Sequence, residues 1–145
     1  MIQPRIKYFH ISNEILYHKL IDKLGITDKK CIIFLNGNVG AGKTTFVKSF
    51  LSYKEYPIDV TSPTFTIVNE YHFDSKKIYH YDFYRLKNKK ELQEIGIDYY
   101  FDQPGIHFVE WPKNFIEILP KSNIDINFFM LKGSRLIKVE FNNEQ

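Results

Sequence analysis

Apolar residues recur along this chain at two different spacings, and each spacing predicts a type of secondary structure. Lys7–Ile11 alternates weakly between apolar and polar residues, which is typical of a β-strand. The next segment has the spacing of an amphipathic helix, with Ser12 or Asn13 as the expected N-cap and Gly25 as the expected end. The helix positions expected to face the core are Ile15, Leu16, Leu20, Ile21 and Leu24.

The same two patterns predict the remaining elements. Apolar runs predict strands at residues 31–35, 64–73, 78–84, 106–109, 123–131 and 136–141. Helical spacing predicts a helix that starts at residue 45 and fades near residue 53, and shorter helices at 89–95 and 114–119. Turn residues at 74–77 and about Gly133-Ser134 predict antiparallel hairpins. Strands and helices in this order predict a three-layer α/β fold with a mixed, partly antiparallel sheet.

Length and composition narrow the class of protein. A chain of 145 residues with 43% hydrophobic and 17% aromatic content can bury one core, so we expect a single domain over residues 1–145. The net charge of +3 is mild and scattered, unlike the concentrated basic surface of a free-standing nucleic-acid-binding protein. Cys31 is the single cysteine, which fits a reducing compartment. With neither a membrane-length apolar run nor a signal-peptide core, the chain is expected to be soluble and cytoplasmic.

The segment Gly37–Thr45, Gly-Asn-Val-Gly-Ala-Gly-Lys-Thr-Thr, follows an apolar strand and precedes a helix. It matches G-x-x-x-x-G-K-[ST], the loop whose glycines turn backbone N–H groups toward phosphate oxygens at a helix N-terminus. In this pattern Lys43 reaches the β- and γ-phosphates, and the Thr44 hydroxyl binds Mg²⁺. The segment therefore predicts a P-loop NTPase fold. It also predicts a nucleoside triphosphate contacted by Asn38, Val39, Gly40, Ala41, Gly42, Lys43, Thr44 and Thr45.

Two carboxylates end predicted strands, where the ligands of open α/β sheets collect. Glu110 closes the apolar run at 106–109, the usual form of the second metal-site element, and a surface carboxylate is the alternative interpretation. Asp82 closes another strand and is a candidate for the acid that hydrolysis requires. A cap or an ion pair to Arg85 is the alternative for Asp82.

Residues 61–64, Thr-Ser-Pro-Thr, lie between the loop helix and the next predicted strand, where a switch loop would sit. The hydroxyls of Ser62 and Thr64 could hydrogen-bond a γ-phosphate or its metal and so order the segment when a triphosphate is bound. An ordinary Ser-Pro turn explains the same residues equally well.

Other nucleotide-binding classes fit the chain less well. The nearest match to the guanine-binding Asn-Lys-x-Asp element is residues 88–91, which end in Glu and open a helix, so adenine is favoured over guanine. Small-molecule kinases usually carry an Arg-rich lid, and this chain has only Arg5, Arg85 and Arg135. A P-loop kinase remains the alternative enzyme, and a module that keeps ATP uncleaved remains the alternative binding protein.

Several segments in this order resemble the TsaE (YjeE) family of bacterial ATPases in tRNA threonylcarbamoyladenosine synthesis. The segments are the loop at 37–45, Thr-Ser-Pro-Thr-Phe-Thr at 61–66, Glu70-Tyr71, His80-Tyr81-Asp82-Phe83-Tyr84-Arg85-Leu86, Glu94-Ile95-Gly96 and Val109-Glu110-Trp111-Pro112. The phosphate loop is generic, whereas Ser-Pro-Thr-Phe, His-x-Asp-x-Tyr-Arg-Leu and Val-Glu-Trp at these separations are specific.

The resemblance implies a small ATPase with weak activity that matters when it docks on the TsaD–TsaB pair, which modifies the adenosine beside the anticodon. It implies tRNA contact only through that complex, and no membrane. By the resemblance, Lys43, Asp82 and Glu110 serve hydrolysis, Thr44 and Glu110 lie at the metal, and Thr64 belongs to the switch. The adenine side would include Ile11, Asn13 and Arg135.

Overall fold

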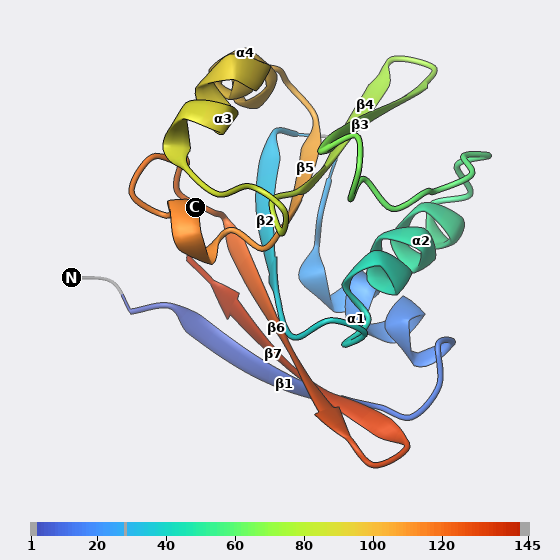
Figure 1. Cartoon of the computed structure of the whole chain (residues 1–145). Helices are drawn as coiled ribbons and strands as arrows, with labels where there is room; N and C mark the ends of the chain where they lie inside the picture. The colour runs from blue at the N-terminus through green and yellow to red at the C-terminus, as the bar shows by residue number, and fades with distance from the viewer. Residues whose placement is uncertain (1–2, 28, 143–145) are drawn as a thin grey trace.

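The computed structural model describes residues 3–27 and 29–142, which form a seven-stranded sheet covered by helices (Figure 1). In chain order the elements are β1 (Arg5–Ile11), α1 (Leu16–Leu24), β2 (Cys31–Asn36), α2 (Lys43–Tyr53), β3 (Val68–Phe73), β4 (Lys76–Asp82), α3 (Lys89–Ile95), α4 (Ile97–Phe101), β5 (Ile106–Glu110), the 3-10 turn η1 (Lys113–Phe115), β6 (Ile124–Leu131) and β7 (Ser134–Phe141). Within the described ranges, no helix is both long and apolar enough to cross a bilayer.

The sheet is mixed, as predicted. Its strand order is β1-β7-β6-β2-β5-β4-β3. The neighbours β6, β2, β5 and β4 pair in parallel, whereas β1 with β7, β7 with β6 and β3 with β4 pair antiparallel. Short turns can join antiparallel strands, but parallel strands need longer crossover connections. The helices α2, α3 and α4 lie in such connections. The predicted α/β fold with antiparallel edges is therefore confirmed.

Two hydrophobic cores lie on opposite faces of the sheet and make the fold three-layered. Leu20 of α1 and Phe46 of α2 are fully buried in the first core. Leu92 of α3 and Phe101 of α4 are buried in the second core. Residues 32–35 of β2 alternate between the two, because successive side chains of a strand point to opposite faces. Figure 1 shows α1 and α2 to the right of the sheet and α3 and α4 at the upper left.

The carboxyl ends of three central strands meet at one edge of the sheet. β2 ends at Asn36, β4 at Asp82 and β5 at Glu110. In the strand register Asp82 lies opposite Glu110, and Glu110 lies opposite Leu35 on its other side. The predicted phosphate-binding loop, residues 37–45, begins directly after β2, so the sheet brings this loop and the two acids together.

Neither Ser12 nor Asn13 caps the first helix, contrary to the prediction. α1 begins at Leu16 and has no side-chain capping hydrogen bond. The Asn13 carbonyl accepts from the Leu16 N–H at 3.2 Å, so the chain first leaves β1 through a backbone turn. Ile15, expected in the core, lies in this turn and is 76% exposed. The later predicted core positions Leu20, Ile21 and Leu24 are buried.

The strand predicted at 64–73 begins only at Val68. The Ile67 N–H donates to the Pro63 carbonyl at 2.6 Å, which closes a turn before the strand. The predicted hairpin with β4 is confirmed, but its turn is Asp74-Ser75 alone, so β4 starts earlier than predicted, at Lys76.

Two short elements differ from the sequence pattern. α4 was not predicted, because Gly96, with a left-handed φ of 77°, ends α3 and immediately begins another helix. The helix predicted at 114–119 is only the 3-10 turn η1, followed by a further turn. The final hairpin is confirmed, with its turn at Lys132-Gly133, since Ser134 already pairs with Leu131.

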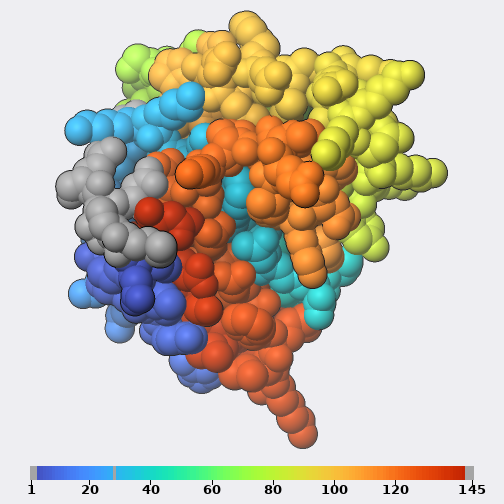
Figure 2. Space-filling view, turned by 90° about the vertical axis from the view of Figure 1, so that its left-hand side faces the viewer, coloured from blue at the N-terminus to red at the C-terminus, as the bar shows by residue number. Residues whose placement is uncertain are grey.

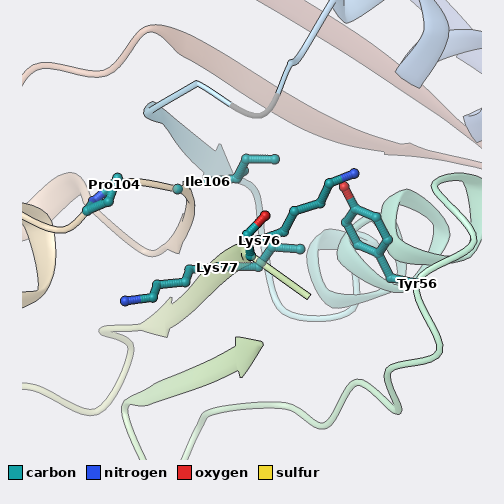
Figure 3. Close-up of a pocket in the computed structure, with 8 residues that line it drawn as sticks. Tyr56, Lys76, Lys77, Pro104 and Ile106 are labelled. Carbon is teal, nitrogen blue, oxygen red and sulfur yellow. The ribbon is translucent and has the colours of Figure 1, made fainter. Parts of the chain in front are cut away.

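A tight approach of two chain segments at Gly105 gives a prediction for stability. Gly105 has a φ of +126°, and a Cβ there would lie 2.3 Å from the Lys77 carbonyl oxygen. Figure 3 shows this end of the sheet, where β4 and β5 begin, with Lys76 extending toward Tyr56 and Lys77 pointing away from it. These residues line a cavity of about 250 Å³.

Gly105→Ala is expected to lower the free energy of unfolding by about 2–5 kcal/mol, because backbone strain adds to a clash with main-chain atoms. Urea unfolding measures this change. Gly133→Ala is the matched control, since Gly133 also has a positive φ, +76°, but its added Cβ would meet nothing within 4 Å. A cost for Gly105→Ala no larger than that for Gly133→Ala would contradict the prediction.

Candidate active site

The loop after β2 needs glycine at defined positions. Gly40 and Gly42 have φ values of 79° and 109°, a region that L-residues with side chains rarely adopt. Gly37 is close to β6, where a Cβ would lie 3.0 Å from the Phe128 carbonyl oxygen. The Gly42 carbonyl accepts from the Phe46 N–H at 2.9 Å, which starts α2. The first N–H groups of α2 have no intrahelical partners and carry the positive end of the helix dipole.

Lys43, the first residue of α2, folds back over this loop. Its Nζ donates to the carbonyls of Gly37 and Asn38, the latter at 3.2 Å. The same Nζ lies 3.9 Å from the centroid of the Trp111 ring. Burial lowers the pKa of the Lys43 ammonium, and the carboxylates of Glu110 and Asp82 oppose that shift. The cation is thus desolvated and held by weak partners, carbonyls and a ring, that an anion could replace.

Thr44 and Glu110 face each other across the end of the sheet. The Thr44 hydroxyl donates to Glu110 Oε2 at 2.9 Å. The same oxygen contacts His80 Nε2 at 2.5 Å. Glu110 is only 3% exposed, so the surface-carboxylate interpretation is wrong. A hydroxyl and a carboxylate side by side are oxygen ligands of the kind that Mg²⁺ prefers.

Asp82 contacts the predicted switch segment. The Thr64 hydroxyl donates to Asp82 Oδ2 at 3.0 Å, and the Tyr84 N–H donates to Oδ1 at 2.9 Å. Ser62 and Thr64 are joined through their hydroxyls at 2.8 Å. Asp82 is 6% exposed, and the Arg85 guanidinium lies 4.4 Å from the centroid of the Phe65 ring. Residues 62–64 are therefore linked to the end of β4 by side-chain hydrogen bonds.

Arg135 of β7 donates hydrogen bonds to the loop that follows β2. Its Nε donates to the Ala41 carbonyl at 2.6 Å, and its Nη2 donates to the Gly40 carbonyl at 3.1 Å. A cavity of about 340 Å³ lies between these elements. Its lining combines the loop, the switch segment and both strand-end acids: Val39, Gly40, Ala41, Gly42, Lys43, Thr44, Thr45, Ser62, Thr64, Asp82, Tyr84, Glu110, Trp111 and Arg135.

The residues predicted for the adenine side lie in an adjoining cavity. Ile11 and Asn13 line a space of about 230 Å³ with Ser12, Glu14 and Tyr17. Gly42, Thr45 and Arg135 line both cavities, so the two spaces are neighbours across the loop. The buried Tyr17 hydroxyl has no hydrogen-bond partner in the described part of the chain. A flat ligand group there would have both an apolar side chain and polar partners within reach.

Asn38 is the predicted contact residue that the structure does not bring to these cavities. It lines a third space, of about 520 Å³, together with Gly37, Trp111, Lys113 and residues of β6. Figure 2 shows this face, where the teal segment after β2 is visible between the orange segment at η1 and the orange-red β6 and β7. The Asn38 carbonyl is linked to the site through its contacts with Lys43 Nζ and the Ala41 N–H.

Trp111 and Tyr84 line the main cavity although neither was predicted as a site residue. Trp111 follows β5 with a left-handed φ of 59°, and its ring lies over Lys43. Tyr84 packs against Trp111, with ring centroids 4.8 Å apart. The sequence feature that could have identified them is their position, because each residue lies within two positions of a strand-end acid.

Several known proteins similar to this chain carry one family name. The sequence model of the family described as Threonylcarbamoyl adenosine biosynthesis protein TsaE matches residues 11–137. The chain is 39% identical over 113 residues to the tRNA threonylcarbamoyladenosine biosynthesis protein TsaE of Haemophilus influenzae, covering 78% of this chain and 72% of that protein. It is 36% identical over 117 residues to the protein of the same name from Borreliella burgdorferi, covering 77% and 80%.

A match to the TsaE protein of Bacillus subtilis is 40% identical over 95 residues and covers 66% of this chain and 59% of that protein. The chain therefore spans less than two thirds of that relative. Among solved structures, the crystal structure of Bacillus subtilis YdiB superposes with a TM-score of 0.76 at 26% identity, covering 99% of this chain and 90% of that chain. All residues that line the two adjoining cavities lie within the family match at 11–137.

Proposed function

This chain belongs to the TsaE family of threonylcarbamoyl adenosine biosynthesis proteins, and from that premise we propose that it binds and slowly hydrolyses ATP in tRNA modification. The triphosphate would lie in the cavity lined by Lys43 and Arg135, with the adenine toward Ile11 and Asn13. Hydrolysis would then reset an association between this protein and the TsaD–TsaB pair, which the family resemblance implies.

One observation carries this proposal: a buried lysine, a helix N-terminus and two strand-end carboxylates line the same cavity. Lys43 begins α2 and is 5% exposed, and Asp82 and Glu110 lie on neighbouring strands. A cationic group beside unpaired backbone N–H groups suits a polyphosphate, whose charge it would neutralise. Lys43 would exchange its contacts with the loop carbonyls for phosphate oxygens.

Thr44 and Glu110 would hold Mg²⁺, which fits their direct contact at 2.9 Å and the preference of Mg²⁺ for hydroxyl and carboxylate oxygens. When bound, the ion supplies positive charge that neutralises the β- and γ-phosphates. Thr44 would give up its bond to Glu110 in that state. Asp82 would orient the attacking water, and Thr64 would leave Asp82 to bond the γ-phosphate.

The contacts of the three arginines support the proposal that the rate of ATP hydrolysis depends on the protein partner. Arg135 donates to the loop carbonyls of Ala41 and Gly40. Arg85 lies against Phe65, and Arg5 lies against Phe141 at the far end of the sheet. Since each described arginine already has another contact, either one of them would have to rearrange or the partner would have to supply an arginine before the transferring phosphate is stabilised. Turnover by the chain alone is therefore expected to be slow.

The experiment is to measure ATP hydrolysis by the purified chain alone, with its TsaD and TsaB, and with candidate small acceptors. We expect slow release of phosphate by the chain alone and faster release with the protein pair. Phosphorylation of an acceptor without the proteins would show a kinase instead. ATP that stays bound and uncleaved under every condition would show a binding module, and either result would overturn the proposal.

A further inference from the structure

Two histidines are fully buried in the central sheet, and they differ in what they contact. His107 of β5 accepts at Nδ1 from the Tyr81 hydroxyl at 2.7 Å, and its Nε2 donates to the Gln103 carbonyl at 2.9 Å. Burial lowers the pKa of His107 to about 4, so its ring is neutral and both nitrogens are satisfied. The bonding of His107 is therefore that of a structural core residue.

His80 of β4 is bonded differently. Its Nε2 lies 2.5 Å from Glu110 Oε2, and its Nδ1 has no hydrogen-bond partner in the described part of the chain. An ionised carboxylate only accepts, so Nε2 is the donor in this contact. A buried polar atom without a partner costs about 1–3 kcal/mol, a cost that the fully bonded His107 ring does not carry. Its one side-chain hydrogen bond within the described part of the chain is to Glu110, the carboxylate of the candidate metal site.

The strand register explains why His80 can reach Glu110. His80 lies opposite Phe108 on β5, two residues before Glu110, and Asp82 lies opposite Glu110 itself. Since alternate residues of a strand share a face, His80 and Asp82 point to the same side of β4 as Glu110 does on β5. The ring thus lies beneath the carboxylate, on the core side of the cavity.

We infer that His80 is a positioning residue, which fixes the Glu110 carboxylate in the orientation that receives a divalent cation. This inference rests on the function proposed above. Thr44 and His80 both donate to Oε2, and only His80 would keep its bond once the Thr44 hydroxyl turns to the ion. Without the ring, Glu110 would lose that remaining donor and adopt several rotamers. Removing such a supporting hydrogen bond typically weakens metal binding by about 10- to 100-fold.

The test measures Mn²⁺ binding by electron paramagnetic resonance on the whole chain with ADP, which gives a readout independent of hydrolysis. His80→Leu is expected to weaken Mn²⁺ binding by about 10- to 100-fold and to leave the metal-free affinity for ADP unchanged. His80→Gln, whose amide N–H can reach the position of Nε2, is expected to restore most of the affinity for Mn²⁺. His107→Leu is the matched control, a buried histidine without a Glu110 contact, and is expected to bind Mn²⁺ as the unmodified chain does.

Wild-type affinity for Mn²⁺ in His80→Leu, or equal weakening in His80→Leu and His107→Leu, would overturn the inference. If His80→Leu does not fold, His80→Asn replaces it, because its shorter amide corresponds to Nδ1 and does not reach Glu110. Equal affinities for Mn²⁺ in the Asn and Gln variants would then overturn it. An unmodified chain that binds no ADP·Mn²⁺ at all would instead contradict the proposed function, so the two failures are distinguishable.

Discussion

Replacing Lys43 with alanine is expected to weaken ATP binding by about 100- to 1,000-fold and to remove measurable turnover. The physical reason is the loss of charge-assisted hydrogen bonds to phosphate, worth about 3–4 kcal/mol together. The ammonium is already desolvated above the loop, against the carbonyls of Gly37 and Asn38 and the Trp111 ring. Little reorganisation is therefore needed before it meets a phosphate. Titration calorimetry with a non-hydrolysable ATP analogue measures the change.

Lys48→Ala is the matched control for Lys43→Ala. Lys48 belongs to the same helix, is exposed, and does not line the cavity, so its removal is expected to leave the affinity for ATP unchanged. Because Lys43 also bonds the loop, thermal unfolding of both variants must be compared before the affinities are read. A folded Lys43→Ala variant that binds ATP as tightly as Lys48→Ala would mean that the cation does not meet the phosphates.

Asp82→Asn should separate binding from cleavage. We expect ATP affinity close to that of the unmodified chain and a rate of hydrolysis lower by about 10²- to 10⁴-fold, the usual contribution of a group that handles the proton of the attacking water. The amide oxygen can still accept from the Tyr84 N–H, so the end of β4 should keep its geometry. Single-turnover hydrolysis with enzyme in excess measures the step directly.

Thr64→Val is the informative comparison for Asp82→Asn. The change removes the hydroxyl that donates to Asp82 Oδ2 and keeps the carboxylate. If Asp82 acts on water, Thr64→Val should retain more activity than Asp82→Asn. Equal losses in both variants would assign the effect to release of residues 62–64 instead. Asp102→Asn, an exposed acid beyond α4, controls for the change of charge.

The loop and both acids were predictable because their signals are local in sequence. Gly37–Thr45 must adopt positive φ angles at fixed glycines, and this requirement leaves a pattern that can be read without a structure. Asp82 and Glu110 end apolar runs, and the carboxyl ends of parallel strands meet at one edge. Predicting that these strands run parallel was enough to place Asp82 and Glu110 near the loop.

The remaining features depend on contacts between distant segments. The His80–Glu110 bond follows from the register of β4 against β5, which periodicity does not determine. Trp111 lies over Lys43 because Trp111 itself adopts a left-handed backbone conformation directly after β5. Glycine is the residue that usually signals this conformation in a sequence, so a tryptophan gave no such signal. Asn38 was expected to contact the nucleotide, but it lines a different cavity from the other predicted contact residues. These features are set by the three-dimensional packing of segments that lie far apart in sequence.

The central claim is that the loop after β2 binds the triphosphate of ATP and that Lys43, Thr44 and Glu110 converge on it. A crystal structure grown with a non-hydrolysable ATP analogue and Mg²⁺ tests this most directly. We predict phosphate density against the N-terminus of α2, Lys43 Nζ within hydrogen-bond distance of phosphate oxygens, and a cation beside Thr44 and Glu110. Nucleotide bound at another place, with Lys43 Nζ still on the carbonyls of Gly37 and Asn38, would contradict the account.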